Sequence, residues 1–223
     1  CTVRNYTNRF VYVSLSGKIE SLTIDDCIFI GADNSTTNKA IYASSAHTQV
    51  ETLSVTNSTF LNFNTGSNYF FRINCGEELV LMPVVLIDHC TFYNCYDRRG
   101  VYLYNAGRST IKNCISAFSE RRDDTKSFTA YGDESIVKNV ISYNVDLYGS
   151  APKENIISKN PLFVDAENGN FQLYKDSPAV GAGDDGSDLG DPRWGVSTEN
   201  APVGELPYEC FKKPYSMSPV SYT

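Results

Sequence analysis

The sequence predicts an all-β protein, a right-handed parallel β-helix (a solenoid) that ends in a C-terminal cap. A short apolar motif recurs along the chain with the period of about 20–50 residues that solenoid repeats show. β-Branched and aromatic residues dominate this motif, and they suit a pleated, half-buried strand. The 3.6-residue spacing of an amphipathic helix is not sustained anywhere, so the repeating unit is predicted to be β-structure.

The motif has six residues and marks a bend between two strands. Its third position holds Asn or Asp in every copy but one, and these residues tolerate the left-handed backbone that a tight bend requires. A second column of the same kind lies four residues after the fourth position of the motif. Two bends per coil at fixed offsets are typical of a β-helix. The first column is Asp26, Asn57, His89, Asn113 and Asn139; the second is Asn5, Gly31, Asn62, Asn94 and Asn144, interrupted by Phe118.

The fourth position of the motif is occupied by small residues and is predicted to face the core. Ser58 and Val140 share this position with the cysteines and cannot form disulfides. Cys27, Cys90 and Cys114 are therefore predicted to be buried free thiols, with Cys1 at the frayed end of their column. The segment Cys1–Asn5 repeats the pattern of Cys90–Asn94, so we expect the chain to begin in mid-coil, with further N-terminal coils in the same protein. The cysteines of this column are Cys1, Cys27, Cys90 and Cys114.

Another strand is predicted before most copies of the motif, at residues 40–44, 70–74, 100–104 and 127–131. Alternate residues of a strand point to opposite faces, and stacked coils turn each position into a continuous stripe. The inward stripes are Ile41, Phe71, Val101 and Phe128, with Ala43, Ile73, Leu103 and Ala130. The outward stripes are Tyr42, Arg72, Tyr102 and Thr129, with Ser44, Asn74, Tyr104 and Tyr131.

The chain is predicted to form one domain with three parts. Residues 1–159 are the coils, 160–198 are a capping segment of the same domain, and 199–223 are an extended tail that contains four prolines. An open solenoid end exposes unpaired strand edges, so the capping segment is expected to cover the last coil.

The capping segment carries three further motifs. Asn160-Pro-Leu-Phe-Val-Asp165, Gly169-Asn-Phe-Gln-Leu173 and Ser177-Pro-Ala-Val-Gly-Ala-Gly183 resemble the C-terminal end of the pectate-lyase-like β-helix superfamily. The continuation Asp188-Leu-Gly-Asp-Pro-Arg-Trp194 is similar to uncharacterised β-helix proteins of bacterial glycan-utilisation systems. The resemblance implies contact with carbohydrate and a secreted or cell-surface location. It transfers no catalytic residue, so the catalytic residues stay unknown.

Charge and hydropathy narrow the choice of partner. Nineteen Lys and Arg against 26 Asp and Glu give a net charge of −7, which disfavours nucleic acid. No apolar run reaches the roughly 20 residues of a membrane span. The leading hypothesis is an extracellular or surface module that contacts polysaccharide without catalysis. The alternatives are a polysaccharide lyase acting by β-elimination on a uronic-acid polymer, a glycoside hydrolase, and a structural spacer.

Two groups of residues are candidates for carbohydrate binding. The first is an aromatic stripe, because tyrosine offers an apolar ring and a hydroxyl to a sugar. The second is a pair of arginine doublets, since guanidinium groups match the carboxylates of uronic acids. Acidic residues flank the doublets, which favours a solvated salt-bridge network over a ligand site. The stripe is Tyr42, Tyr102, Tyr104 and Tyr131 with Arg72; the doublets are Arg98-Arg99 and Arg121-Arg122.

Other polar residues are expected to be structural. His89 takes an Asn or Asp position in the bend column, while Lys112 and Lys138 are predicted to decorate the surface. The stretch Asp184–Asp188 with Asp191 has enough oxygen atoms for calcium but lacks a full calcium-loop spacing. An acidic turn without metal is the favoured interpretation, and no cofactor is expected.

Overall fold

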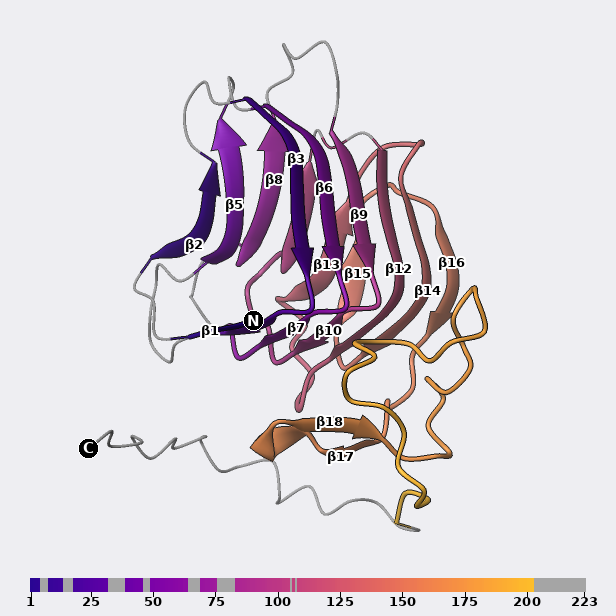
Figure 1. Ribbon diagram of the computed structural model, residues 1–223. Coiled ribbons are helices and arrows are strands. Elements are labelled where there is room, and N and C mark those ends of the chain that lie inside the picture. The colour runs from indigo at the N-terminus through magenta and orange to yellow at the C-terminus, as the bar shows by residue number, and fades with distance from the viewer. Residues whose placement is uncertain are drawn as a thin grey trace, which may run out of the picture.

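The chain folds into a stack of parallel β-coils. The computed structural model describes residues 1–4, 8–13, 18–31, 39–45, 49–63, 69–75, 83–104, 106 and 108–202. Two parallel sheets stack there as a solenoid of about 4 turns (Figure 1). The only helical element of these residues is a 3₁₀ turn, η1 (Ala166–Asn168). The predicted all-β solenoid is therefore confirmed.

The first sheet has ten strands and divides at its longest strand, β12 (Arg108–Ala117). The N-terminal half of β12 pairs with β9 (Val84–Asp88), and its C-terminal half pairs with β10 (Thr91–Tyr93). The two branches are therefore successive sides of the same coils. The other strands are β1 (Thr2–Val3), β3 (Lys18–Asp25), β4 (Ile28–Ile30), β6 (Gln49–Thr56), β7 (Thr59–Leu61), β14 (Ile136–Tyr143) and β16 (Lys153–Ile157).

The second sheet supplies another side of the coils. Its six strands pair in parallel with their neighbours, and they lie behind the first sheet in Figure 1. In order they are β2 (Arg9–Val13), β5 (Lys39–Ser45), β8 (Phe71–Cys75), β11 (Val101–Tyr104), β13 (Lys126–Ala130) and β15 (Asp146–Tyr148).

The bend columns adopt the conformation that their residues predict. Every member of the first column has a positive φ, and Asn155 of β16 adds a sixth member. In the second column, Asn62, Asn94 and Asn144 also have positive φ, and Asn5 lies outside the described residues. Gly31 lacks a positive φ, and a Cβ there would lie 2.3 Å from the Asn62 carbonyl oxygen. Close approach of the backbone, rather than a left-handed bend, therefore explains this glycine.

The core is a set of stacked rows inside the coils. Phe29, Phe60 and Phe92 stack with ring centroids 4.8 and 5.0 Å apart. The inward stripes predicted for the second sheet are all buried. Cys90 and Cys114 are buried free thiols, as predicted, whereas Cys27 is half-buried and Cys1 is exposed. Burial raises the pKa of the Cys90 thiol, which keeps it protonated.

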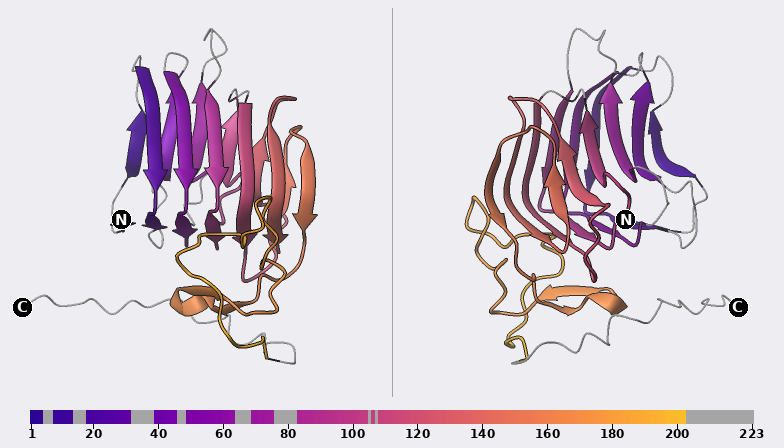
Figure 2. Two further views of the ribbon diagram at one scale, coloured as in Figure 1. Left: turned by 45° about the vertical axis from the view of Figure 1, so that its right-hand side comes forward. Right: turned by 180° about the vertical axis from the view of Figure 1, so that it is seen from behind.

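The capping segment lies across the flank of the coils. Its antiparallel strands β17 (Phe163–Asp165) and β18 (Asn170–Leu173) are separate from the two parallel sheets (Figures 1 and 2). The Phe171 ring lies 5.3 Å from that of Tyr93, on the outward side of β10. Strand β16 of the last coil stays exposed or half-buried. The described contacts of this segment therefore lie along the flank of the coils, not over their open end.

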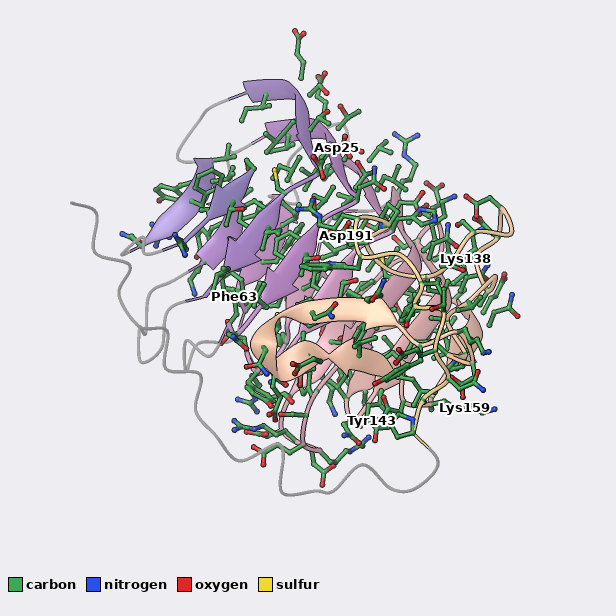
Figure 3. The ribbon with its side chains drawn as sticks, turned by 60° about the horizontal axis from the view of Figure 1, so that its bottom comes forward. Asp25, Phe63, Lys138, Tyr143, Lys159 and Asp191 are labelled. Carbon is green, nitrogen blue, oxygen red and sulfur yellow. The ribbon has the colours of Figure 1, made fainter. Side chains whose placement is uncertain are left out.

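Asp191, Arg193 and Trp194 fasten the cap to the coils, and we call the segment Asp191–Trp194 the clamp. Asp191 accepts a hydrogen bond from Thr59 Oγ1 at 2.7 Å, and its N–H donates to Thr91 Oγ1 at 2.9 Å. Trp194 Nε1 donates to the same Thr59 hydroxyl at 2.8 Å. Arg193 reaches Asp26 at 2.7 Å, so the clamp spans three successive coils. In Figure 3, Asp191 lies where the cap loops cross the coils.

The chain leaves the cap along its surface. Lys175 N donates to Glu199 O at 2.9 Å, and Ala201 N donates to Asp176 Oδ1 at 2.8 Å. Most of the predicted tail, residues 203–223, lies outside the described residues.

Candidate functional site

The outer face of the second sheet carries a row of large side chains in register. Strand pairing aligns Tyr12 with Tyr42, Tyr42 with Arg72, and Arg72 with Tyr102. The row continues through Thr129 to Tyr148 on β15. Because these strands are stacked, a single position of the repeat forms one line of side chains along the solenoid axis.

Seven tyrosines form a continuous chain of ring contacts on this face, which we call the tyrosine ladder. The Tyr69 and Tyr102 rings stack at 5.5 Å, and the Tyr102 and Tyr104 rings at 5.9 Å. Edge-to-face contacts then join Tyr104 to Tyr131 at 5.4 Å and Tyr131 to Tyr148 at 6.4 Å. The members of the ladder are Tyr12, Tyr42, Tyr69, Tyr102, Tyr104, Tyr131 and Tyr148.

Cationic side chains lie between the rungs of the ladder. Arg9 lies 4.3 Å from the Tyr12 ring centroid, Arg72 lies 4.5 Å from that of Tyr69, and Arg99 lies 4.9 Å from that of Tyr102. Arg72 also donates hydrogen bonds to the Tyr42 and Tyr69 hydroxyls. Within the described part of the chain, Arg9, Arg72 and Arg99 form no salt bridge with a carboxylate. The ladder therefore combines flat aromatic surface with guanidinium groups that lie against aromatic rings.

Burial differs along the ladder. Tyr102 was predicted to face outward, but only 7% of it is exposed, because Tyr69, Tyr104 and Arg99 pack around it. Thr129 is also buried, and its hydroxyl donates to Arg99 O at 3.1 Å. The large exposed rings are Tyr12, Tyr104 and Tyr148, with 51%, 36% and 56% of their surface accessible. A ligand would meet these three rings first.

Burial shifts the pKa values of three side chains on this face. Burial lowers the pKa of the Lys39 ammonium, and the Asp97 carboxylate partly offsets this effect. Burial likewise raises the pKa of the Tyr69 and Tyr131 hydroxyls, so both remain neutral hydrogen-bond donors at neutral pH.

The ladder ends in a shallow hollow of about 310 Å³. Tyr131 and Tyr148 form its aromatic walls, and Lys153 stands at its edge. The Lys153 ammonium donates to the carbonyl oxygens of Gly149 and Ala151.

Of the two arginine doublets, Arg121-Arg122 forms the predicted salt-bridge network, and no carboxylate pairs with Arg98 or Arg99 among the described residues. Arg121 pairs with Asp123 at 2.9 Å and with Asp146 at 2.8 Å. Arg122 pairs with Glu120 at 3.0 Å and lies over the Tyr96 ring. Arg98 is exposed. Because acidic neighbours already occupy Arg121, this residue is a poor receptor for a ligand carboxylate.

Lys112 and Lys138 of the first sheet hold the cap rather than decorate the surface. Both contact Asp184, Lys112 at 3.3 Å and Lys138 at 3.0 Å. A hydrogen bond from Asn113, together with the contacts of Lys138 and Lys112, holds the pKa of Asp184 well below its usual range. No three His, Cys, Asp or Glu side chains within the described ranges converge in a way that could hold a metal ion.

Several members of the ladder were missed by the sequence analysis. The alternation of Arg9–Val13 matches that of the later strands and could have revealed Tyr12. Arg9 shares the parity of the inward Val11 and Val13, so alternation does not predict its contact with the Tyr12 ring. Tyr69 precedes its strand and enters the ladder by folding over the sheet, so no strand pattern predicts it. Tyr148 lies on β15, whose pairing with β13 shifts register. Its spacing from the earlier members therefore differs from the repeat, and a constant repeat length does not predict it.

These features define a class of protein: a parallel β-solenoid with a flank-bound cap and an aromatic, cationic outer face. Residues 85–194 match the model of a family described as "Domain of unknown function (DUF5123)". The matched residues begin in β9 and end at Trp194, the last residue of the clamp. No match is found among curated proteins. The described residues include no helix long and apolar enough to cross a membrane.

Proposed function

We propose that the tyrosine ladder binds an extended polysaccharide, with preference for chains that carry carboxylates. The observation that carries the proposal is the unbroken contact of seven aromatic rings with interleaved cations on one face. Sugar rings stack on tyrosine faces, whose hydroxyls also donate and accept hydrogen bonds. Arginine adds bidentate recognition of carboxylates.

The dimensions of the ladder suit a polymer better than a single sugar. The row from Tyr12 to Tyr148 crosses six neighbouring strands, and strands about 4.8 Å apart give it a length of roughly 24 Å. A linear chain lying along the solenoid axis would contact several rungs at once. Such a role places the protein outside the cell or on its surface, where polysaccharides are met.

Substitution of exposed rings tests the proposal. Tyr104 and Tyr148 suit the test better than the buried Tyr102, since their replacement removes ligand surface without opening the core. Each ring is expected to contribute about 1 kcal/mol, so the Tyr104→Ala, Tyr148→Ala double variant should bind roughly 30-fold more weakly. Affinity electrophoresis in gels that contain polygalacturonate, alginate or a neutral galactan provides the measurement.

A substitution on the first sheet serves as the control for the loss of binding. Val84→Ala removes an exposed apolar side chain from the first sheet and should leave retardation unchanged. If the parental protein is retarded and the double variant is retarded equally, the ladder is not the site. If no polymer retards the parental protein, the spacer hypothesis replaces the proposal. Incubating the protein with the same polymers in solution tests the alternative of a lyase, since β-elimination would release unsaturated products that absorb ultraviolet light.

A further inference from the structure

A second hollow lies between the cap and the flank of the coils, away from the tyrosine ladder. Its volume is about 410 Å³. Apolar side chains form much of its wall, and His89 and Ser187 face the same space. The apolar residues include Ile115, Phe163, Phe171, Leu173, Leu189 and Trp194.

Three polar side chains form a line at this hollow. His89 Nδ1 lies 2.8 Å from Asp88 Oδ1, and His89 Nε2 lies 2.7 Å from Ser187 Oγ. Ser187 comes from the cap and lies 98 residues further along the chain than His89. A hydroxyl, an imidazole and a carboxylate in series are the arrangement that activates a serine nucleophile.

Each member of the line is held by the fold. His89 has a φ of 49° in the bend column, which turns its ring toward the cap. Asp88 Oδ1 accepts a second hydrogen bond from Asn113 Nδ2 at 3.0 Å, and Lys112 lies 3.4 Å from Asp88 Oδ2. These contacts hold the Asp88 carboxylate in place, and it favours the imidazole tautomer with its proton on Nδ1.

The serine sits in a tight turn of the cap. Gly183 N donates to Ser187 O at 2.8 Å, and Ser187 N donates to Asp185 Oδ1 at 2.9 Å. A Cβ at Gly183 would lie 2.9 Å from Ser187 Oγ, so the turn packs closely around the hydroxyl. Asp185 competes for the single hydroxyl proton of Ser187. Donation of this proton to His89 Nε2 is the assignment that makes Ser187 nucleophilic.

We propose that Asp88, His89 and Ser187 form a hydrolytic site for carboxylic esters with a small apolar acyl group. Ser187 Oγ attacks the carbonyl carbon, and His89 Nε2 takes the hydroxyl proton. The C–O bond to the alcohol then breaks as His89 returns that proton to the leaving oxygen, which leaves an ester on Ser187. His89 then takes a proton from a water molecule as its oxygen attacks the acyl carbon. The bond between that carbon and Ser187 Oγ breaks as His89 returns the proton to Oγ, which releases the carboxylic acid and free Ser187. The apolar wall would hold the acyl group, and the site stands independently of the polysaccharide proposal.

Covalent labelling and turnover of a model ester test the site together. A fluorophosphonate should add to Ser187, with peptide mapping by mass spectrometry to locate the adduct. The full chain should also hydrolyse p-nitrophenyl butyrate. Ser187→Ala and His89→Asn should each lose the label and lower the hydrolysis rate by at least about 100-fold.

The chain itself offers the matched substitution. Asn occupies the bend at Asn57, Asn113 and Asn139 with the same positive φ, so His89→Asn keeps the backbone and removes only the base. Ser197→Ala changes another cap serine and should leave labelling and rate unchanged. Circular dichroism confirms that each variant is folded.

Two results would overturn the inference. The first is a parental protein that takes no phosphonate, or takes it on another residue. The second is a folded His89→Asn variant that hydrolyses the ester at the parental rate. In either case the line of side chains serves only to fasten the cap to the coils.

Discussion

Asparagine at the bend column both accepts a left-handed backbone and bonds to a neighbouring coil. Asn57 Nδ2 donates to Asp25 Oδ1 at 2.8 Å, and Asn113 Nδ2 donates to Asp88 Oδ1 at 3.0 Å. On the last coil, Asn155 Nδ2 donates to Asn139 Oδ1 at 2.9 Å. Such side-chain bonds run along the axis, parallel to the ladder of backbone hydrogen bonds. The column therefore links the coils as well as turning them.

Gly31 provides a test at the residue scale. Gly31→Ala should destabilise the protein by about 1–3 kcal/mol, because the new methyl group would overlap the Asn62 carbonyl oxygen. Gly169→Ala is the comparison, since Gly169 has a φ of 81° and open space around it. That variant should lose only about 1–2 kcal/mol, the cost of a left-handed alanine. Urea unfolding followed by circular dichroism gives both values, and equal stability of Gly31→Ala and the parental protein would contradict the steric explanation.

Among the elements, the clamp shows how a short motif can attach the cap to the coils. Asp191 and Trp194 share the Thr59 hydroxyl, and Arg193 extends the contact to Asp26. Gly190 precedes them with a φ of 89°, and a Cβ there would lie 2.8 Å from Thr91 Oγ1. The residues that support the resemblance to glycan-utilisation proteins thus hold the cap in place. They do not contact the tyrosine ladder.

Acid should loosen the attachment of the cap through Asp184. Its pKa is depressed in the folded protein, so its contribution is complete above the ordinary value of 3.8 and is lost as the pH falls below that value. Asp184→Asn should therefore destabilise the protein by up to about 1 kcal/mol at pH 7. The difference in melting temperature between variant and parental protein should shrink below pH 3.8. A difference that stays constant between pH 7 and pH 3 would show that the charge of Asp184 is irrelevant.

Local patterns predicted the strands and bends of the coils well, because each depends on residues that are close in sequence. The bends were predicted from the Asn and Asp positions, and the buried face of the strand at Ile41–Ala43 from alternation of its residues. The juxtaposition of His89 with Ser187 could not be predicted, since it depends on where the cap docks. The burial of Tyr102 was missed for a related reason: Tyr69 and Arg99 fold over the sheet from outside the strand pattern.

For the whole molecule, the flank-bound cap covers an apolar surface that the coils cannot bury alone. Outward residues of one side of the coils, including Leu61, Tyr93 and Ile115, pack with Phe163 and Phe171 of the cap. A chain that ends at residue 159 would expose this surface to water. Large exposed apolar patches promote association.

Truncation tests this role of the cap. A chain of residues 1–159 should aggregate or form oligomers in light scattering, whereas the full chain should not. Substituting Tyr93→Ser in the truncated chain should reduce the association, because it makes the exposed flank more polar. A truncated chain that remains monomeric would show that the flank does not need its cover.

The spacing of the outer row has an evolutionary consequence. Tyr12, Tyr42, Arg72 and Tyr102 are each 30 residues apart and lie in direct register, since 42 − 12, 72 − 42 and 102 − 72 are equal. Duplication or loss of one such unit in the gene would add or remove one rung and leave the others aligned. Homologues with more or fewer coils would then differ in the length of polymer that they grip, while each rung keeps its own chemistry.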